Sequence, residues 1–204
     1  MNSESGNPIR KFARFISILL VPPSFTIIVF TIFAFTLEYE TAKIIVTILT
    51  AFVFGFISPV ILFFVLRKKG KLKDIDASVK EERTFPFLLA IIFYSAGLAV
   101  LIIFQVNIIS IAFWFCYISN TILTILINKY WKISAHSMGA AGSLAAAFYV
   151  FGLPVLLFFL LVFILGWARI YLKMHTLSQV VAGIILAFVS VFLQMTIIIN
   201  LFGK

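Results

Sequence analysis

The chain contains only two histidines, and each stands where a helix is expected to begin. His175 belongs to residues 167–179, which bring a cation, an imidazole and a side-chain amide into an otherwise apolar sequence. His136 belongs to residues 132–137. An ionisable side chain in or near a bilayer is costly, so it is a candidate for function. Together with Arg83 on a basic loop, these segments predict a single phosphate-binding site.

Gln179 follows His175 by four residues, which places both side chains on one face of a helix. The amide oxygen could accept the imidazole N–H and fix one tautomer, which leaves the other ring nitrogen free to attack. The spacing Thr176-x-x-Gln179 also fits a helix capping box, and the two roles are compatible. Arg169 precedes His175 by six residues, about 240° around an ideal helix. We therefore expect a turn near residues 173–174, so that both side chains face one ligand.

Ser134 lies two residues before His136, and we expect it to cap the helix that follows. The free backbone N–H groups at a helix N-terminus favour a bound anion. His136 would then be placed to protonate a leaving oxygen. The alternative is an interfacial histidine that hydrogen-bonds a headgroup or a backbone carbonyl. Two histidines at two helix starts on one face favour the joint site.

Arg83 and Arg169 are candidate phosphate clamps, since a guanidinium group matches phosphate in bidentate geometry. A snorkelling interfacial cation is the alternative for Arg83. Asp74 and Asp76 suggest a magnesium–diphosphate site, but the sequence offers no second acidic cluster on the same face. We therefore interpret them as part of a solvated loop and expect neither a metal nor a cofactor.

The composition indicates which elements must position these residues. Of 204 residues, 63% are hydrophobic and 11% are charged, whereas soluble domains are roughly 45–50% apolar and about 25% charged. The sequence therefore predicts an all-α, polytopic transmembrane helix bundle in the cell membrane, with residues 1–204 forming a single domain. The net charge of +9 is more typical of membrane topology than of nucleic-acid binding.

About six or seven spans are expected, because a span needs roughly 20 apolar residues. Their predicted ranges are 15–37, 44–66, 86–105, 108–127, 134–151, 154–172 and 176–202. Pro22 and Pro23 should kink or divide the first span, and Pro59 should kink the second. Small residues recur every four positions in the fifth span, which favours close helix approach and a central place in the bundle. They are Ala135, Gly139, Ser143 and Ala147.

If the chain crosses the membrane with each of the seven predicted spans, three stretches lie on the same face as the N-terminus: residues 67–85, 132–137 and 168–179. Of the 16 lysines and arginines, all except Lys43 and Lys204 also fall on this face. Cytoplasmic connections carry an excess of such cations, so this face and the N-terminus are expected to be cytoplasmic.

The third of these stretches resembles a motif of the type-2 phosphatidic acid phosphatase superfamily, Ser-Arg-x5-His-x3-Asp. Arg169, His175 and Gln179 keep its spacing in full, with Ala168 in place of the serine and Gln179 in place of the aspartate. The pattern His-Thr-x-x-Gln is similar to that of the dolichyl-diphosphatases in the same superfamily. The resemblance covers roughly residues 60–190.

The other two motifs of that family are matched in part. Its Pro-Ser-Gly-His appears as residues 133–136, which keep Ser134 and His136. In its Lys-x6-Arg-Pro, Arg83 fits the arginine, but Asp76 stands in place of the lysine and the proline comes two residues late. Lys80 or Lys73 could substitute for that lysine.

The resemblance implies an integral membrane hydrolase that removes phosphate from a lipid phosphate or an isoprenoid (polyprenyl) diphosphate without a metal. His175 would form a phosphohistidine, with Gln179 in place of the acid that orients it, and His136 would protonate the leaving group. The remaining site residues would hold the phosphate: Arg83, Arg169, Ser134 and Lys80. Two alternatives are a catalytically decayed relative that binds anionic lipid and a membrane transporter.

Overall fold

The computed structural model describes residues 7–74 and 79–203, and this part of the chain consists of helices joined by short connections, without a strand. The helices in chain order are α1 (Pro8–Leu19), α2 (Pro22–Leu37), α3 (Thr41–Thr50), the π-helix η1 (Ala51–Ile57), α4 (Ser58–Lys68), the 3₁₀ helix η2 (Lys80–Arg83), α5 (Thr84–Ile103), α6 (Ile108–Tyr130), α7 (Ala135–Phe151), the 3₁₀ helix η3 (Leu153–Phe158), α8 (Phe159–Tyr171) and α9 (Leu177–Phe202). The predicted all-α fold is confirmed.

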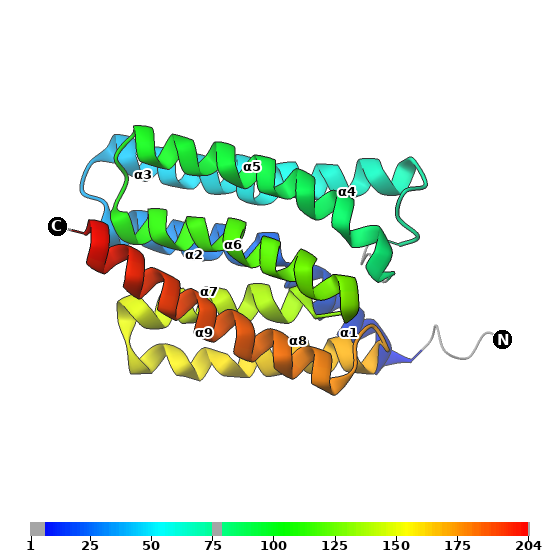
Figure 1. Cartoon of the computed structure of the whole chain (residues 1–204). Coiled ribbons are helices and arrows are strands. Elements are labelled where there is room, and N and C mark those ends of the chain that lie inside the picture. Colours follow the sequence, from blue (N-terminus) through cyan, green and yellow to red (C-terminus); the bar gives the residue numbers. More distant parts are fainter. Residues whose placement is uncertain (1–6, 75–78, 204) are drawn as a thin grey trace.

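Successive helices run back and forth between the two ends of one bundle (Figure 1). Five helical stretches of the described residues are long and apolar enough to cross a membrane, and the bent pair α1–α2 makes six if it is a single span. The five are Thr41–Lys68, Lys80–Ile103, Ile108–Tyr130, Leu153–Tyr171 and Leu177–Phe202. The predicted fifth span corresponds to α7, which at 17 residues is shorter than the others. The structure therefore supports five to six spanning helices.

The first predicted span is divided, as the proline pair suggests. Helices α1 and α2 meet at an angle of 53°, and Pro22 and Pro23 occupy the first turn of α2, where a missing N–H costs nothing. The predicted start at residue 15 is wrong, because α1 begins at Pro8, where Asn7 accepts a hydrogen bond from the backbone N–H of Ile9 (2.9 Å). The result is a separate short helix that packs along α8.

The second predicted span is continuous, but its irregularity precedes Pro59. The backbone of η1 is π-helical, which lets the chain absorb an extra residue before α4 begins. Gly55 lies in this segment, and a Cβ there would approach Thr26 Cγ2 at 2.5 Å. The close contact with α2 therefore requires glycine at this position.

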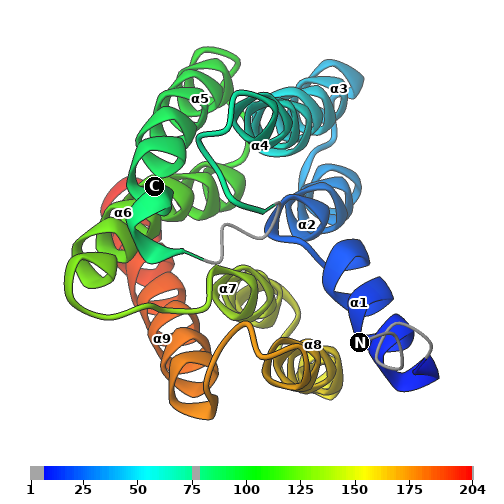
Figure 2. The same ribbon diagram turned by 90° about the vertical axis from the view of Figure 1, so that its right-hand side faces the viewer.

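Helix α7 lies in the middle of the bundle, surrounded by α2, α8 and α9 (Figure 2). Its central turns are buried and consist mostly of alanine, glycine and serine. A Cβ on Gly139 would meet Pro22 at 2.9 Å, and one on Gly142 would meet Val191 at 3.2 Å. Small side chains thus bring neighbouring helices close to α7, and its predicted central place is confirmed.

The two ends of the bundle differ in what they hold. At one end, Glu38 accepts a hydrogen bond from the backbone N–H of Asn107 (2.6 Å), which ties the α2–α3 connection to the α5–α6 connection. The other end holds α1, η2 and the connections α6–α7 and α8–α9 (Figure 1). We call this second end the site end, since it gathers the three stretches that the sequence places on one face.

Candidate functional site

His175 lies in the short connection between α8 and α9. Lys173 adopts a positive φ of 57°, which reverses the chain after α8. The backbone N–H groups of Met174 and His175 then both donate to the carbonyl oxygen of Arg169 (3.0 and 3.3 Å). The predicted turn near residues 173–174 is confirmed, and it folds His175 back against the end of α8.

Gln179 fixes the tautomer of His175. Its Oε1 accepts the backbone N–H of Thr176 at 3.2 Å, which identifies this atom as the acceptor, and it also lies 3.1 Å from Nδ1 of His175. Nδ1 must therefore carry the proton, and the lone pair of the ring is on Nε2. The capping box is present as well, because Thr176 Oγ1 accepts the N–H of Gln179 at 3.3 Å. A single glutamine thus serves the helix start and the imidazole at once.

Arg83 links the first stretch to both histidine segments. Its side chain is 3% exposed, and Nη1 donates to the carbonyl oxygen of Ile133 at 2.9 Å. Its Nη2 lies 3.5 Å from Nε2 of His175, on the side of the ring that carries the lone pair. The guanidinium group of Arg83 and the unprotonated nitrogen of His175 therefore face each other directly.

The surroundings of His175 keep its ring neutral. Burial lowers its pKa, and the positive charges of Arg83, Lys132 and Arg169 lower it further, against the hydrogen bond to Gln179, to about 3. A neutral imidazole is the form that can act as a nucleophile.

The second segment begins α7 beside α9. Ser134 is fully buried, and its Oγ accepts the N–H of Ser137 at 3.3 Å, so the predicted cap is confirmed. Its own N–H donates to the carbonyl oxygen of Gln179 at 3.4 Å. The approach depends on Gly183, where a Cβ would lie 3.0 Å from the oxygen of Ser134. The starts of α7 and α9 are therefore locked together.

A cavity of about 630 Å³ extends from this region into the bundle. Its lining includes one arginine, Arg83, and one histidine, His136, and most of the remaining wall is apolar. Exposed apolar side chains such as Ile18, Leu19 and Phe64 also line it, so it opens at the side of the bundle near the α1–α2 bend. Arg83 is thus shared between the cavity and the contact with His175.

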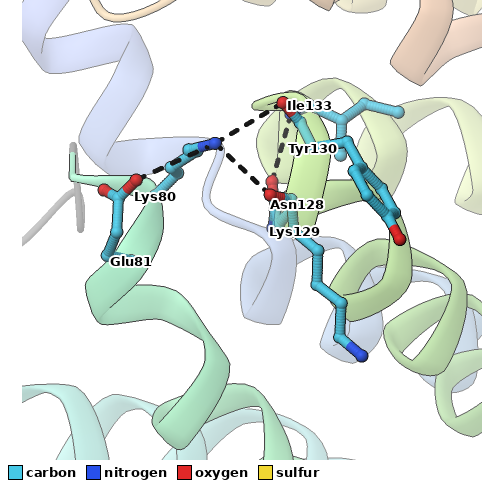
Figure 3. Close-up of polar contacts among 6 residues, drawn as sticks. All are labelled: Lys80, Glu81, Asn128, Lys129, Tyr130 and Ile133. Atoms are coloured by element: carbon cyan, nitrogen blue, oxygen red, sulfur yellow. Dashed lines mark hydrogen bonds and ion pairs between the residues drawn. The ribbon is translucent and has the colours of Figure 1, made fainter.

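Two predicted phosphate ligands make other contacts. Arg169 is fully buried, and its Nη1 donates to Ser17 Oγ on α1 at 2.6 Å. Lys80 lies against the last carbonyl oxygens of α6, those of Lys129 (3.5 Å) and Tyr130 (3.4 Å), and 3.8 Å from Oε1 of Glu81 (Figure 3). A lysine at this position stabilises the C-terminus of a helix.

The described residues contain no group of three or more histidine, cysteine, aspartate or glutamate side chains that could share a metal ion. Asp74 is among these residues, whereas Asp76, which stands in place of the first-motif lysine, lies outside them.

Three residues of the site were missed by the sequence analysis. Lys132 donates to the carbonyl oxygen of Met174 (2.7 Å), and Asn128 accepts the N–H of Ile133 through Oδ1 (3.2 Å). Ser17 is the partner of Arg169. In the sequence, Lys132 is one of several cations expected at the membrane interface. No sequence motif predicts the contact of Asn128 with Ile133 or that of Ser17 with Arg169.

The described part of the chain is all-helical, and five of its helical stretches, or six with the bent pair α1–α2, have the length and apolar character of membrane spans. Comparison of the chain with protein-family models, with curated proteins and with solved structures gave no match.

Proposed function

We propose that the protein is a multi-pass membrane phosphatase that hydrolyses a lipid phosphate or an isoprenoid diphosphate through a phosphohistidine. The observation that carries this proposal is the orientation of His175, whose Nε2 lone pair faces the guanidinium of Arg83 while Gln179 holds the proton on Nδ1. A nucleophilic imidazole needs one nitrogen held protonated and the other unprotonated, and we propose that a bound phosphate would take the place of the contact between Arg83 and Nε2. The motif resemblance to the type-2 phosphatidic acid phosphatases assigns the same histidine to the same step.

The chemistry divides into two steps. Nε2 of His175 attacks phosphorus and forms a P–N bond, while the P–O bond to the lipid breaks and His136 gives its proton to the departing oxygen. Water then attacks the phosphohistidine, His136 takes the proton back, and inorganic phosphate leaves. During both steps Gln179 Oε1 accepts the Nδ1–H, which becomes more acidic once the ring is phosphorylated. Arg83 and Arg169 supply positive charge for the phosphate oxygens.

The cavity supports a lipid substrate. A tail in its apolar part would leave the headgroup beside Arg83 and His136, which line the same space. The lateral opening near Ile18 and Phe64 would admit the chain from the bilayer without passage through water. With the site at the cation-rich end, the positive-inside rule favours a cytoplasmic active site in the cell membrane.

The test is phosphate release by the purified protein in detergent, from a polyprenyl diphosphate and from phosphatidic acid, with excess EDTA throughout. We expect EDTA-resistant release that His175→Ala abolishes and that His136→Ala reduces strongly. Acid-labile, base-stable ³²P on the wild type but not on His175→Ala would identify the phosphohistidine. Release that survives His175→Ala would contradict the mechanism.

A non-catalytic lipid-phosphate binder is the second candidate, and Gln179 is the observation that favours it. A carboxylate at this position would stabilise the imidazolium charge in the transition state, and an amide does so less well. Folded wild-type protein that binds both lipids but releases phosphate from neither would support this candidate.

A further inference from the structure

Helix α1 is too short to cross a bilayer on its own. Its 12 residues rise about 18 Å, whereas the hydrocarbon core of a bilayer is about 30 Å thick. The next helix, α2, starts beside the start of α7, because a Cβ on Gly139 would meet Pro22 at 2.9 Å. Before the 53° bend between the two helices, α1 extends sideways from α2 when the bundle is viewed from the site end (Figure 2). α1 therefore lies beside the bundle at that end.

Two contacts show that α1 crosses the end of α8 obliquely. Asn7 Nδ2, at the start of α1, donates to the hydroxyl of Tyr171 (3.3 Å). Ser17 Oγ, near the other end of α1, accepts Nη1 of Arg169 (2.6 Å). The two residues of α1 are about 15 Å apart along their helix, whereas their partners are about 3 Å apart along α8. Because α8 ends a candidate membrane span, α1 is inclined towards the plane of the membrane.

The end of α8 that α1 contacts has the composition of a membrane interface. Trp167 and Tyr171 are both exposed there, and their stacked rings lie 5.4 Å apart between centroids. The ring of Phe12 on α1 lies 6.4 Å from that of Trp167. Tryptophan and tyrosine are enriched at the headgroup level of a bilayer, because their rings are amphipathic. These contacts indicate that α1 lies at the depth of the lipid headgroups.

The two sides of α1 present different surfaces. Ala13 and Ser17, which are four residues apart, are buried against the bundle. On the other side, Phe12, Phe15 and Leu19 follow the spacing of a helical stripe and are 52–59% exposed. A contiguous stripe of large apolar side chains is typical of a surface that binds a partner or a membrane. At the headgroup level, the upper acyl chains of the bilayer are such a partner.

α1 also carries positive charge. It contains Arg10, Lys11 and Arg14 and no acidic residue. The two arginines have other interactions within the chain, whereas Lys11 is exposed and makes no hydrogen bond or ion pair with the described residues. A helix with an aromatic and aliphatic face and a lysine at its polar edge is typical of helices that lie in the interface and attract anionic lipids.

We propose that α1 is an interfacial helix that binds the anionic lipid surface of the leaflet at the site end. The stripe of Phe12, Phe15 and Leu19 lies among the upper acyl chains, and Lys11 lies among the headgroup phosphates. Ile18 and Leu19 also line the cavity, so the bound lipids lie beside its opening. The inference does not depend on the proposed phosphatase activity, and its test needs no substrate.

Two other arrangements would also give an exposed stripe. In one, α1 continues α2 as part of the same span, and in the other a second copy of the chain covers the stripe. Depth-dependent quenching separates them. A fluorophore is attached to Phe12→Cys or Leu19→Cys in vesicles of phosphatidylcholine and phosphatidylglycerol, and lipids with a nitroxide at known depths are the quenchers. Cys116 is buried, so the introduced cysteine should take the label.

We expect the labels at positions 12 and 19 to lie near the headgroups and to differ in depth by much less than the about 10 Å between them along the helix. Ile185→Cys and Leu193→Cys are the control pair, because both residues are exposed on the candidate span α9. Their depths should differ by most of the about 12 Å between them. An equally large difference at positions 12 and 19 would make α1 part of a span. Labels that lipid nitroxides do not quench would show that protein covers the stripe. Either result would overturn the proposal.

The second measurement tests the charge of the lipid. With the label on Phe15→Cys, nitroxide-labelled phosphatidylglycerol should quench more strongly than labelled phosphatidylcholine at the same mole fraction, and high salt should reduce the difference. Lys11→Gln should lower this preference by up to about fivefold, the effect of one lysine near an anionic surface. Lys69→Gln is the matched control, since it removes an exposed lysine at the end of α4 and should leave the preference unchanged. A wild type without the preference, or Lys11→Gln with the same effect as Lys69→Gln, would refute binding of anionic lipid by α1.

Discussion

Gln179 Oε1 lies 3.1 Å from Nδ1 of His175 and also accepts the N–H of Thr176, so the amide that completes a helix cap also decides which imidazole nitrogen is free. We expect Gln179→Leu to lower kcat by roughly 10- to 100-fold, the cost found when a metal-bound histidine loses the partner that orients its ring. Thr176→Ala is the control, because it removes the cap, at about 1 kcal/mol of stability, and leaves the imidazole contact. Equal loss of kcat in both variants would mean that the cap alone matters.

The protonation of His175 is measurable in a chain with one histidine. In His136→Ala, the only imidazole left is that of His175, so its ¹⁵N NMR signals need no assignment. We expect a protonated Nδ1 and an unprotonated Nε2 from pH 8 down to pH 5, because the pKa is lowered to about 3. A titration midpoint near 6.5 would show that the cations and burial do not act as the geometry implies.

The same lowered pKa has a consequence for stability. The unfolded chain takes up a proton on this histidine below about pH 6.5, whereas the folded protein does so only near pH 3. Stability therefore falls as the pH decreases from about 6.5 towards 3. Gln179→Glu should raise the pKa of His175, because the carboxylate stabilises the imidazolium, and it should reduce this loss. Unfolding midpoints of the two proteins, measured from pH 7 to pH 4, provide the comparison.

The hydrogen bond between Arg169 and Ser17 joins α8 to α1 across 152 positions of sequence. We expect Ser17→Ala to lower the free energy of unfolding by about 2 kcal/mol, since it removes a buried partner of a charged group. It should also raise KM, because the guanidinium group loses a contact that orients it. Thr36→Ala is the control, as this exposed hydroxyl bonds only the carbonyl oxygen of Ile32 in its own helix. Unfolding titrations in mixed micelles compare the two variants.

The cavity predicts a difference between substrates with and without a tail. Ala90 lines it on α5, and Ala90→Phe should fill part of its volume and raise KM for a long-chain lipid phosphate by about tenfold. Release from a water-soluble phosphate monoester should change little. Leu88→Phe adds a ring on the same helix at an exposed position and should leave both substrates unaffected. Equal effects of Ala90→Phe on both substrates would contradict a tail site.

The orientation of the bundle is open to cysteine labelling in intact cells. Cys116 is buried, so an introduced cysteine should be the one that reacts with the label. Lys69 and Tyr39 are exposed, and a cysteine at Lys69 reports the site end while one at Tyr39 reports the opposite end. A membrane-impermeant maleimide added outside should label Tyr39→Cys and spare Lys69→Cys. The reverse pattern would place the site end outside the cell and overturn the cytoplasmic assignment.

The sequence predicted most helix ends because these are set by local chemistry. Prolines 22 and 23 divide the first apolar run, Ser134 caps α7, and Thr176 with Gln179 caps α9. The lengths of the apolar runs then locate most of the remaining helices. Because successive helices run in opposite directions, the three stretches fall at the same end of the bundle.

The contacts of the site that join residues far apart in sequence have no local signal, unlike that of Gln179 with His175, which the four-residue spacing predicted. Ser17 looked like an ordinary helix residue, and its partner Arg169 is far away in sequence. Lys132 stands among interfacial aromatics and cations, where topology explains a lysine equally well. The extension of α1 back to Pro8 was missed as well, because a 12-residue helix with three cations does not have the composition of a span.

The α6–α7 connection is tied to α9 by the backbone hydrogen bond from the N–H of Ser134 to the carbonyl oxygen of Gln179 (3.4 Å), whereas the turn at Gly152 has a positive φ of 73° and open space where a Cβ would lie. Foreign sequence should therefore be accepted very differently at the two ends. A reporter peptide or a fluorescent protein is best grafted beside Gly152. The same graft between residues 131 and 134 should break the contacts of Ile133 with Arg83 and of Ser134 with Gln179, and so disrupt the proposed site.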